Sequence, residues 1–282
     1  MIRLTYAELQ ENVTGVTTLN GQIFVVYRQL PFIVVYMSQQ PYHRLADISI
    51  KGMKNPQDIA AGGSCLYLSD AGVRAIWRVN AADGKGEKWL SGVLAEGLSV
   101  TSDEKLVLLV WVDAQGSEEE LSATWHGEIH IYGRDAVKES VIKLSRDITA
   151  PHYVVMTTRK TFIVSYGMRW HEMNRVCEVD MTGRMLKAFG STQGEAVGQL
   201  SEPWYMSLDE DERIIVADTL NDRVVLLNKQ LMLQRVLVTW HPQSSSDVGG
   251  PGRLHYDSHS GRLLVGLNNG HLDIYQLRAG IC

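Results

Sequence analysis

The sequence predicts an all-β protein, a six-bladed β-propeller whose blades are four-stranded antiparallel sheets. Three observations lead to this prediction. Segments with the two-residue period of a strand recur along almost all of the 282 residues, and segments with a helical period are nearly absent. One β-rich unit is repeated six times. Its spacing of roughly 40–50 residues is the period expected of propeller blades.

Two copies of this unit are the clearest. Residues 202–209 lead into a strand that ends at Asp218, and residues 55–60 lead into a strand that ends at Asp70. Each copy begins near a proline, forms a short apolar strand and a turn, continues into the strand that ends in aspartate, and goes on to a third strand. Aligning all six copies at the same point gives one equivalent residue per blade: Thr14, Asp58, Gly97, Tyr153, Tyr205 and Arg253.

The strands of each blade follow from apolar runs separated by Gly, Asn, Asp and Pro turns. In blade one these runs cover residues 22–28, 32–38 and 45–50. Blades three and four have the same pattern, with longer connections at residues 113–126 and 167–174. We therefore expect six blades at residues 13–50, 57–91, 97–144, 152–190, 204–238 and 253–277.

The last blade is one strand short at the C-terminal end of the sequence. At the other end, Ile2 and Leu4 alternate with polar residues, as they do in a half-buried strand. We expect residues 1–7 to complete the sixth blade by pairing with residues 271–277. This pairing closes the ring and protects its edges, and the prediction is a single propeller domain over residues 1–282.

Composition and charge are those of an ordinary globular chain, with 45% hydrophobic residues and a net charge of −5. This charge gives no basic footprint of nucleic-acid binding. Three cysteines at wide spacing favour reduced thiols, with Cys65 and Cys177 inside strands. No run reaches the ~20 apolar residues of a membrane span, and the N-terminal segment alternates where a secretory signal is apolar. We expect a cytoplasmic monomer without a membrane partner.

Residues 202–227 resemble an NHL repeat, because a proline and a turn precede a strand ending at Asp218, followed by Asn221 and Arg223. Residues 55–79 resemble a second, weaker copy, and the other four blades lack the aspartate that ends the second strand. NHL propellers occur at the C-terminus of tripartite-motif proteins, and related rings form amidating lyases and other pocket enzymes. The resemblance implies the fold and leaves the function open. We interpret the aspartates as acceptors for backbone N–H groups of the following turn.

Function on such a ring is expected where loops can vary without disturbing the blades. The loops that lead into the first strand of each blade, and those that join its second and third strands, share one face around the axis. On this face, aromatic, histidine and arginine side chains come together, which is the composition of a partner-binding hot spot. The predicted binding residues are Trp125, His126, His152, Arg169, Trp170, His171, Trp204 and Tyr205.

The sequence therefore predicts a recognition module that binds a protein or peptide partner on this face. An enzyme with a small-molecule substrate pocket at the channel mouth, lyase-like or hydrolase-like, is the first alternative. A buried arginine beside tyrosines can bind and polarise a carboxylate, and a tyrosine can act as general acid or base if its pKa is lowered. The candidate catalytic residues are Arg253, Tyr205, Tyr153, Asp58 and Glu96.

Single-stranded RNA binding on the same face is the second alternative. Arg223 and Arg253 would contact phosphates and Trp204 would stack on a base, but the negative net charge of −5 opposes this function. The histidines on this face fall on separate loops without the close spacing of metal ligands. We therefore expect no metal site and no cofactor.

Overall fold

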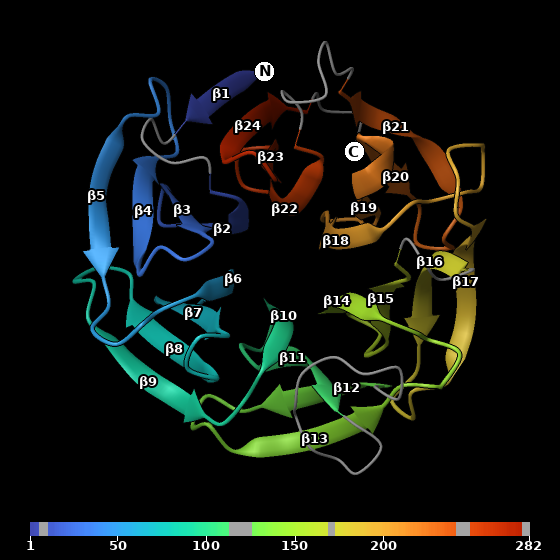
Figure 1. The fold of residues 1–282 in the computed structure, drawn as a ribbon, viewed down its shortest axis with the longest axis horizontal. Coiled ribbons are helices and arrows are strands. Elements are labelled where there is room, and N and C mark those ends of the chain that lie inside the picture. The colour runs from blue at the N-terminus through green and yellow to red at the C-terminus, as the bar shows by residue number, and fades with distance from the viewer. Residues whose placement is uncertain (6–10, 113–125, 169–172, 241–248, 278–282) are drawn as a thin grey trace.

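The computed structural model describes residues 1–5, 11–112, 126–168, 173–240 and 249–277. These residues form six four-stranded antiparallel sheets arranged as blades around a central axis (Figure 1). The six-bladed β-propeller predicted from the repeats is therefore confirmed. The described residues contain one short 3₁₀ helix, η1 (Thr219–Asn221). No helix within them is long and apolar enough to cross a membrane.

The two inner strands of each blade carry most of the buried apolar residues. The innermost strands surround the axis and are β2 (Val13–Leu19), β6 (Pro56–Gly62), β10 (Ala95–Val100), β14 (Pro151–Met156), β18 (Pro203–Leu208) and β22 (Pro251–Asp257). The second strands are β3 (Gln22–Tyr27), β7 (Cys65–Asp70), β11 (Leu106–Val112), β15 (Phe162–Tyr166), β19 (Ile214–Asp218) and β23 (Arg262–Leu267). Their near-continuous burial is expected, because neighbouring blades cover both faces of each sheet.

The two outer strands become progressively more polar toward the circumference. The third strands are β4 (Phe32–Met37), β8 (Ala75–Asn80), β12 (His126–Tyr132), β16 (Met173–Val179), β20 (Arg223–Leu227) and β24 (His271–Gln276). The outermost strands are β5 (Arg44–Ser49), β9 (Gly86–Ser91), β13 (Lys138–Lys143), β17 (Met185–Thr192), β21 (Leu233–Thr239) and β1 (Ile2–Thr5). Apolar side chains of adjacent blades pack face to face, so the core lies between the blades.

The N-terminal strand completes the sixth blade, beside the last strand of the chain (Figure 1). β1 pairs antiparallel with β24, with Ile2 opposite Ile274. Arg3 donates two hydrogen bonds to Asp273, from Nε to Oδ1 at 2.6 Å and from Nη2 to Oδ2 at 2.7 Å. Closure of the ring by the N-terminal strand is therefore confirmed. Residues 6 and 7 of the predicted pairing segment lie outside the described residues.

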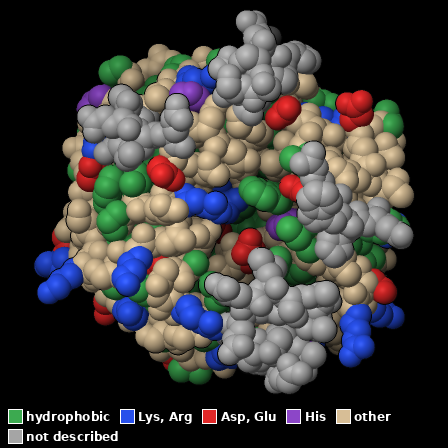
Figure 2. Space-filling model, viewed as in Figure 1, with side chains coloured by type: hydrophobic (Ala, Val, Ile, Leu, Met, Phe, Trp, Pro, Cys, Tyr) green, Lys and Arg blue, Asp and Glu red, His purple; other side chains and the backbone are tan. Residues whose placement is uncertain are grey.

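The strand pairing shows which loops share a face of the ring. In blade two, Pro56 lies opposite Asp70, Asp70 opposite Ala75, and Ala75 opposite Ser91. The beginnings of the first and third strands and the ends of the second and fourth strands are therefore on one side, which we call the mouth face. The opposite side is called the far face. Figure 2 shows the mouth face, hollowed at its centre over the innermost strands.

Candidate functional site

Every innermost strand has a β-bulge at its second residue. In blade two, Pro56 lies opposite Asp70 but Asp58 lies opposite Ser69, so Gln57 is the extra residue. A bulge changes the direction of the side chains around it and increases the local twist. The same shift occurs in all six blades and gathers one extra residue from each at the channel mouth: Thr14, Gln57, Glu96, His152, Trp204 and Gly252.

The bulges correct the sequence alignment of blade one. Val13 lies opposite Tyr27 and Gly15 opposite Val26, so Gly15 and not Thr14 is the equivalent of Asp58. A Cβ atom on Gly15 would lie 2.7 Å from the backbone nitrogen of Ile59 in the next blade. This close approach requires glycine. Because glycine has no side chain, the sequence of blade one gives no sign that Gly15 is the equivalent of Asp58.

Side chains from opposite blades close the channel below its mouth. The Tyr205 hydroxyl of blade five donates to Asp58 Oδ1 of blade two at 2.9 Å. The Tyr205 ring stacks on Tyr153, with 3.8 Å between the ring centroids, and the Tyr153 hydroxyl donates to the carbonyl of Leu98 at 3.2 Å. Together with Arg253, these three side chains form what we call the plug. The plug joins the two sides of the ring by hydrogen bonds.

Arg253 holds the plug against three blades. Its guanidinium lies over the Tyr205 ring, 5.3 Å from the ring centroid. Nη1 donates to the carbonyl of Gly252 at 2.8 Å, Nη2 donates to the carbonyl of Gln57 at 3.3 Å, and Nε donates to the carbonyl of Thr14. All three acceptors are neutral, so these bonds orient the guanidinium without neutralising its charge.

Asp58 is the buried acid of the plug. Its side chain accepts the backbone N–H groups of Ile59 at 2.8 Å and Leu98 at 2.9 Å, in addition to the Tyr205 hydroxyl. Burial raises the pKa of Asp58 to about 7, although the charge of Arg253 and the hydrogen bonds oppose that shift. A buried carboxylate must lose its hydration, which favours the neutral form.

The two tyrosines of the plug are held in the protonated state. Burial raises the pKa of both Tyr153 and Tyr205, and the negative charge of Asp58 raises each further. A tyrosine that exchanges a proton near neutral pH needs a lowered pKa. The condition under which Tyr205 or Tyr153 was expected to act as general acid or base is therefore not met in this structure.

A small hollow of about 60 Å³ lies above the plug. Pockets for small organic ligands usually enclose about 300–1,000 Å³, so this hollow has room for only a few atoms. Figure 2 shows charged, histidine and apolar side chains around the central depression of this face. The residues that line the hollow are Arg28, Gln57, Glu96, His152, Trp204, Tyr205 and Arg253.

Glu96 and Arg28 are the exposed charges of the hollow. The protein around the mouth removes much of the bulk water near Glu96 although the side chain stays exposed, and this desolvation raises its pKa. The charges of Arg253 and Arg28 act in the opposite direction. Within the described part of the chain, neither Glu96 nor Arg28 has an ion-pair partner in contact.

His152 and Trp204 form the aromatic side of the hollow. The His152 side chain is buried, and its Nε2 lies 3.0 Å from the carbonyl of Gly167. Because a carbonyl can only accept, Nε2 carries the hydrogen. The ring centroids of His152 and Trp204 are 6.0 Å apart. The indole Nε1 of Trp204 is buried and has no hydrogen-bond partner among the described residues.

Most of the predicted site residues that the structure describes lie together at the mouth, and four others are outside the described residues. All five candidate catalytic residues meet at the plug or the hollow, together with His152 and Trp204. His126 begins β12, the third strand from the axis, where its Nε2 lies 3.9 Å from Glu128 Oε1, and it does not line the hollow. The predicted binding residues outside the described residues are Trp125, Arg169, Trp170 and His171.

Two residues that line the hollow were not among the predicted site residues. Arg28 directly follows β3, so it begins a connection between a second and a third strand. Such connections were expected on the mouth face, and the position of Arg28 was therefore a usable signal. Gln57 is a bulge residue. Its direction depends on the bulge, which strand periodicity does not reveal.

The aspartates that end two of the second strands are committed to internal hydrogen bonds, but mostly not to the backbone N–H groups of the following turn that were predicted. Asp218 accepts the Ser201 N–H at 2.6 Å, Asn221 Nδ2 at 2.8 Å and Arg223 Nε at 2.6 Å. Asp70 accepts the backbone N–H groups of Lys54, Asn55 and Gly72, of which only that of Gly72 belongs to the following turn, and the indole Nε1–H of Trp77 at 3.1 Å. Arg223 is thereby committed to Asp218 and to backbone carbonyls, which removes it from the arginines expected to contact RNA.

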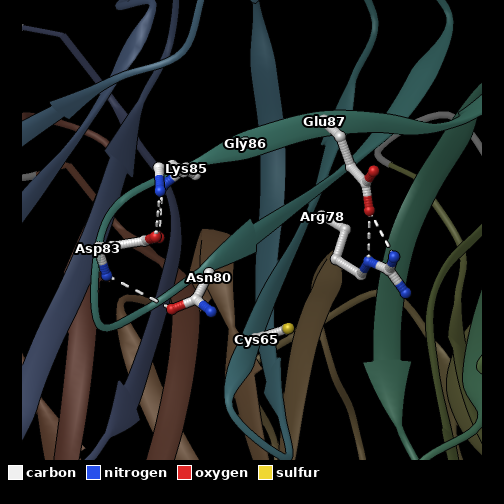
Figure 3. A pocket seen from close by; sticks show the side chains of 7 residues that line it. All are labelled: Cys65, Arg78, Asn80, Asp83, Lys85, Gly86 and Glu87. Atoms are coloured by element: carbon white, nitrogen blue, oxygen red, sulfur yellow. Dashed lines mark hydrogen bonds and ion pairs between the residues drawn. The ribbon is translucent and has the colours of Figure 1, made fainter.

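A larger hollow of about 340 Å³ opens on the far face of blade two (Figure 3). Arg78 Nε donates to Glu87 Oε1 at 2.8 Å on one wall, and Lys85 Nζ lies 3.1 Å from Asp83 Oδ2 on the other. Cys65 lies between these two walls (Figure 3). The charges of this hollow are thus neutralised by one another. In the described residues, no group of three His, Cys, Asp or Glu side chains is placed to hold a metal ion.

Comparison with known proteins identifies the architecture. No protein-family model and no curated protein sequence matches the chain. A gluconolactonase from Xanthomonas campestris matches 96% of this chain and 88% of its own, with 12% identity and a TM-score of 0.68. The chain is a six-bladed β-propeller. At this identity the likeness shows the fold and nothing more.

Other solved structures give the same result with different functions. A catalytically inactive virginiamycin B lyase from Staphylococcus aureus, solved with quinupristin, matches 98% of this chain and 99% of its own at 9% identity and a TM-score of 0.64. An auxiliary nutrient binding protein from Bacteroides thetaiotaomicron matches 94% of this chain and 69% of its own at 9% identity and a TM-score of 0.65. Enzymes and binding proteins are thus both among the structural neighbours, and the fold does not choose between them.

Proposed function

We propose that this chain is a recognition module that binds a protein or peptide partner on its mouth face. The side chains that meet across the channel, and the small hollow above them, are the observation that carries this proposal. The hydrogen bonds of the plug are made within the ring, and the hollow above it encloses only about 60 Å³. A hollow of that size accepts the end of one side chain or one chain terminus. The rest of the contact has to come from the surrounding face.

The composition of the mouth supports recognition. Trp204 and Arg28 are of the residue types that dominate binding energy at protein interfaces, and His152 packs against the tryptophan. The likeness of blades two and five to NHL repeats supports the same proposal, because propellers of that kind occur beside other domains. The hydrogen bonds of the plug hold the centre of the mouth face in place before binding. Binding therefore does not cost the entropy of ordering these side chains.

A selection experiment tests the proposal and does not require the partner to be identified first. A random peptide library and a random single-stranded RNA pool are panned in parallel against the purified full chain, and the affinities of selected ligands are measured by fluorescence polarisation. We expect peptides to be enriched. Their affinity should fall at least about tenfold in a variant with Trp204→Ala and Arg28→Ala, the size of effect expected from losing hot-spot contacts.

Matched controls make the outcome specific to the mouth face. Arg184 lies in the turn between β16 and β17 on the far face, with its side chain 76% exposed, and Arg184→Ala should leave peptide affinity unchanged. Thermal unfolding of each variant shows whether the ring stays folded. Enrichment of RNA alone would favour the RNA alternative. Peptides that bind the double mouth variant as well as the unmodified chain would overturn the proposal.

A further inference from the structure

The charged groups of the hollow differ from those of the larger hollow on the far face. On the far face, Arg78 is paired with Glu87 and Lys85 with Asp83. At the mouth, Arg28, Glu96 and Arg253 line one small space, and within the described residues none of the three belongs to an ion pair. Charges that line a hollow without ion-pair partners create an electrostatic potential there, and this potential attracts a ligand of the opposite charge.

The balance of these charges favours an anion. A guanidinium has five N–H donors, and Arg253 uses three of them on backbone carbonyls, which leaves two N–H groups. The exposed guanidinium of Arg28 adds a second cation. Glu96 is the one acid that lines the hollow. Asp58 lies below it, fully buried, and because burial raises the pKa of Asp58 to about 7, its carboxyl group is only partly ionised near neutral pH.

The size of the hollow limits the anion to a small one. At about 60 Å³ the hollow is several-fold smaller than the roughly 300–1,000 Å³ of a pocket for a small organic ligand. The two oxygens of a carboxylate fit this space, and a planar carboxylate matches the geometry of guanidinium donors. We propose that the hollow receives a single carboxylate group of the partner, which binds between the guanidinium groups of Arg28 and Arg253. This inference rests on the proposed recognition function.

Trp204 provides a reporter beside the hollow. Its side chain lines the hollow, and its indole Nε1 is buried without an acceptor among the described residues. A carboxylate charge bound in the hollow changes the electrostatic field at this indole. The chemical shift of an indole N–H responds to such a change. Among the seven tryptophans, the signal of Trp204 is assigned by its disappearance in Trp204→Phe.

The test is an NMR titration of the full chain with small probes. The protein is labelled with ¹⁵N-tryptophan and titrated at pH 6, below the pKa of about 7 of Asp58, and at constant ionic strength with acetate, acetamide or ethylammonium. We expect acetate to move the Trp204 indole signal to saturation, while acetamide, which has the same shape without the charge, leaves it in place. The absence of a saturable shift with acetate would overturn the inference. Saturable binding of ethylammonium instead would show a site for cations.

Two substitutions at the mouth are expected to act in opposite directions. Arg28→Gln removes one cation and should weaken acetate binding about fivefold, and Glu96→Gln removes the competing carboxylate and should strengthen it about fivefold, as expected for one charge a few ångströms away in a solvated site. Arg184→Gln on the far face is the control and should have no effect. Equal affinities in all four proteins would contradict the assignment of the site.

Two further probes identify the source of the carboxylate. N-acetyl-alanine carries it as a chain terminus, and N-acetyl-aspartate N-methylamide carries it on a side chain. Tighter binding of the first indicates capture of a C-terminus, and tighter binding of the second indicates an acidic side chain. Failure here is separable from failure of the proposed function. Selected peptides whose affinity does not depend on any carboxylate would leave recognition standing and overturn this inference.

Discussion

Removing the N-terminal strand tests whether the pairing of β1 with β24 holds the ring closed. β1 contributes the outer edge of blade six, and Arg3 forms two hydrogen bonds to Asp273. The Asp273 carboxylate is completely buried, whereas the Arg3 side chain is 38% exposed. Ile2 and Leu4 are partly buried against the apolar cluster between blades six and one. Deleting residues 1–5 removes all of these contacts.

The size of the effect follows from these contacts. Loss of the partner of a buried charge costs about 3–5 kcal/mol when both groups are buried, and the exposure of Arg3 reduces this to about 2 kcal/mol. Ile2 and Leu4 add about 1 kcal/mol each because they are partly buried. The sum is about 4 kcal/mol. Using an unfolding entropy of about 2.1 cal/mol/K per residue, we expect the melting temperature to fall by about 7 °C.

Thermal unfolding followed by circular dichroism at pH 7.5 measures this effect. Arg3→Ala alone should lower the melting temperature by about 3 °C, which is the share of the ion pair in the same estimate. Adding Asp273→Asn should restore part of that loss, because a buried charge that has lost its cation, and keeps only the donors of Trp240 and Tyr275, is then removed. Arg134→Ala, at an exposed guanidinium, is the control. A deletion variant that melts within 1 °C of the intact chain would refute the closure argument.

Three other perturbations have defined outcomes. Burial raises the pKa of Asp58 from 3.8 in the unfolded chain to about 7, so its favourable contribution to the free energy of unfolding is complete below pH 4 and is lost as the pH rises through 7. Asp58→Asn should therefore raise the melting temperature at pH 8 and raise it less at pH 5, and equal shifts at both pH values would contradict the assignment. Asp218→Ala leaves three donors without their acceptor and should lower the free energy of unfolding by about 2–4 kcal/mol in urea denaturation, whereas a loss below about 0.5 kcal/mol would show that the carboxylate is dispensable. Gly97→Ala places a Cβ 2.8 Å from Tyr153 Cδ2 and should cost about 1–3 kcal/mol by overpacking, and an unchanged melting temperature would show that the plug yields.

The fold could be predicted because its signals are repeated in the sequence. Each blade has a turn, an apolar strand and a second turn at a similar spacing. The pattern of one blade is weak evidence by itself, but its repetition in six blades gives a clear period. The closing strand was predictable for a different reason. An alternating segment at one end of the chain matched a missing edge at the other, and β1 occupies that edge.

The candidate site was predictable only in part. The alignment placed Tyr153, Tyr205 and Arg253 at equivalent positions, and the structure gathers them in the plug. The hydrogen bond between Tyr205 and Asp58 joins residues from opposite blades, and a repeat pattern describes each blade separately. Strand periodicity also assigns one direction to each residue. It does not show a bulge, and the bulges determine which side chains turn toward the mouth.

The plug and the hollow together limit how the mouth face can work. In the plug, the donors of Tyr153 and Tyr205 and the carboxylate of Asp58 are satisfied within the ring, so a ligand gains nothing by displacing them. The groups that remain available at the centre are the charges that line the hollow, on Arg28, Glu96 and, within the plug, Arg253. Affinity at the centre must therefore be electrostatic and confined to a few atoms. Specificity must come from the wider rim, where residues can change without disturbing the hydrogen bonds that join opposite blades.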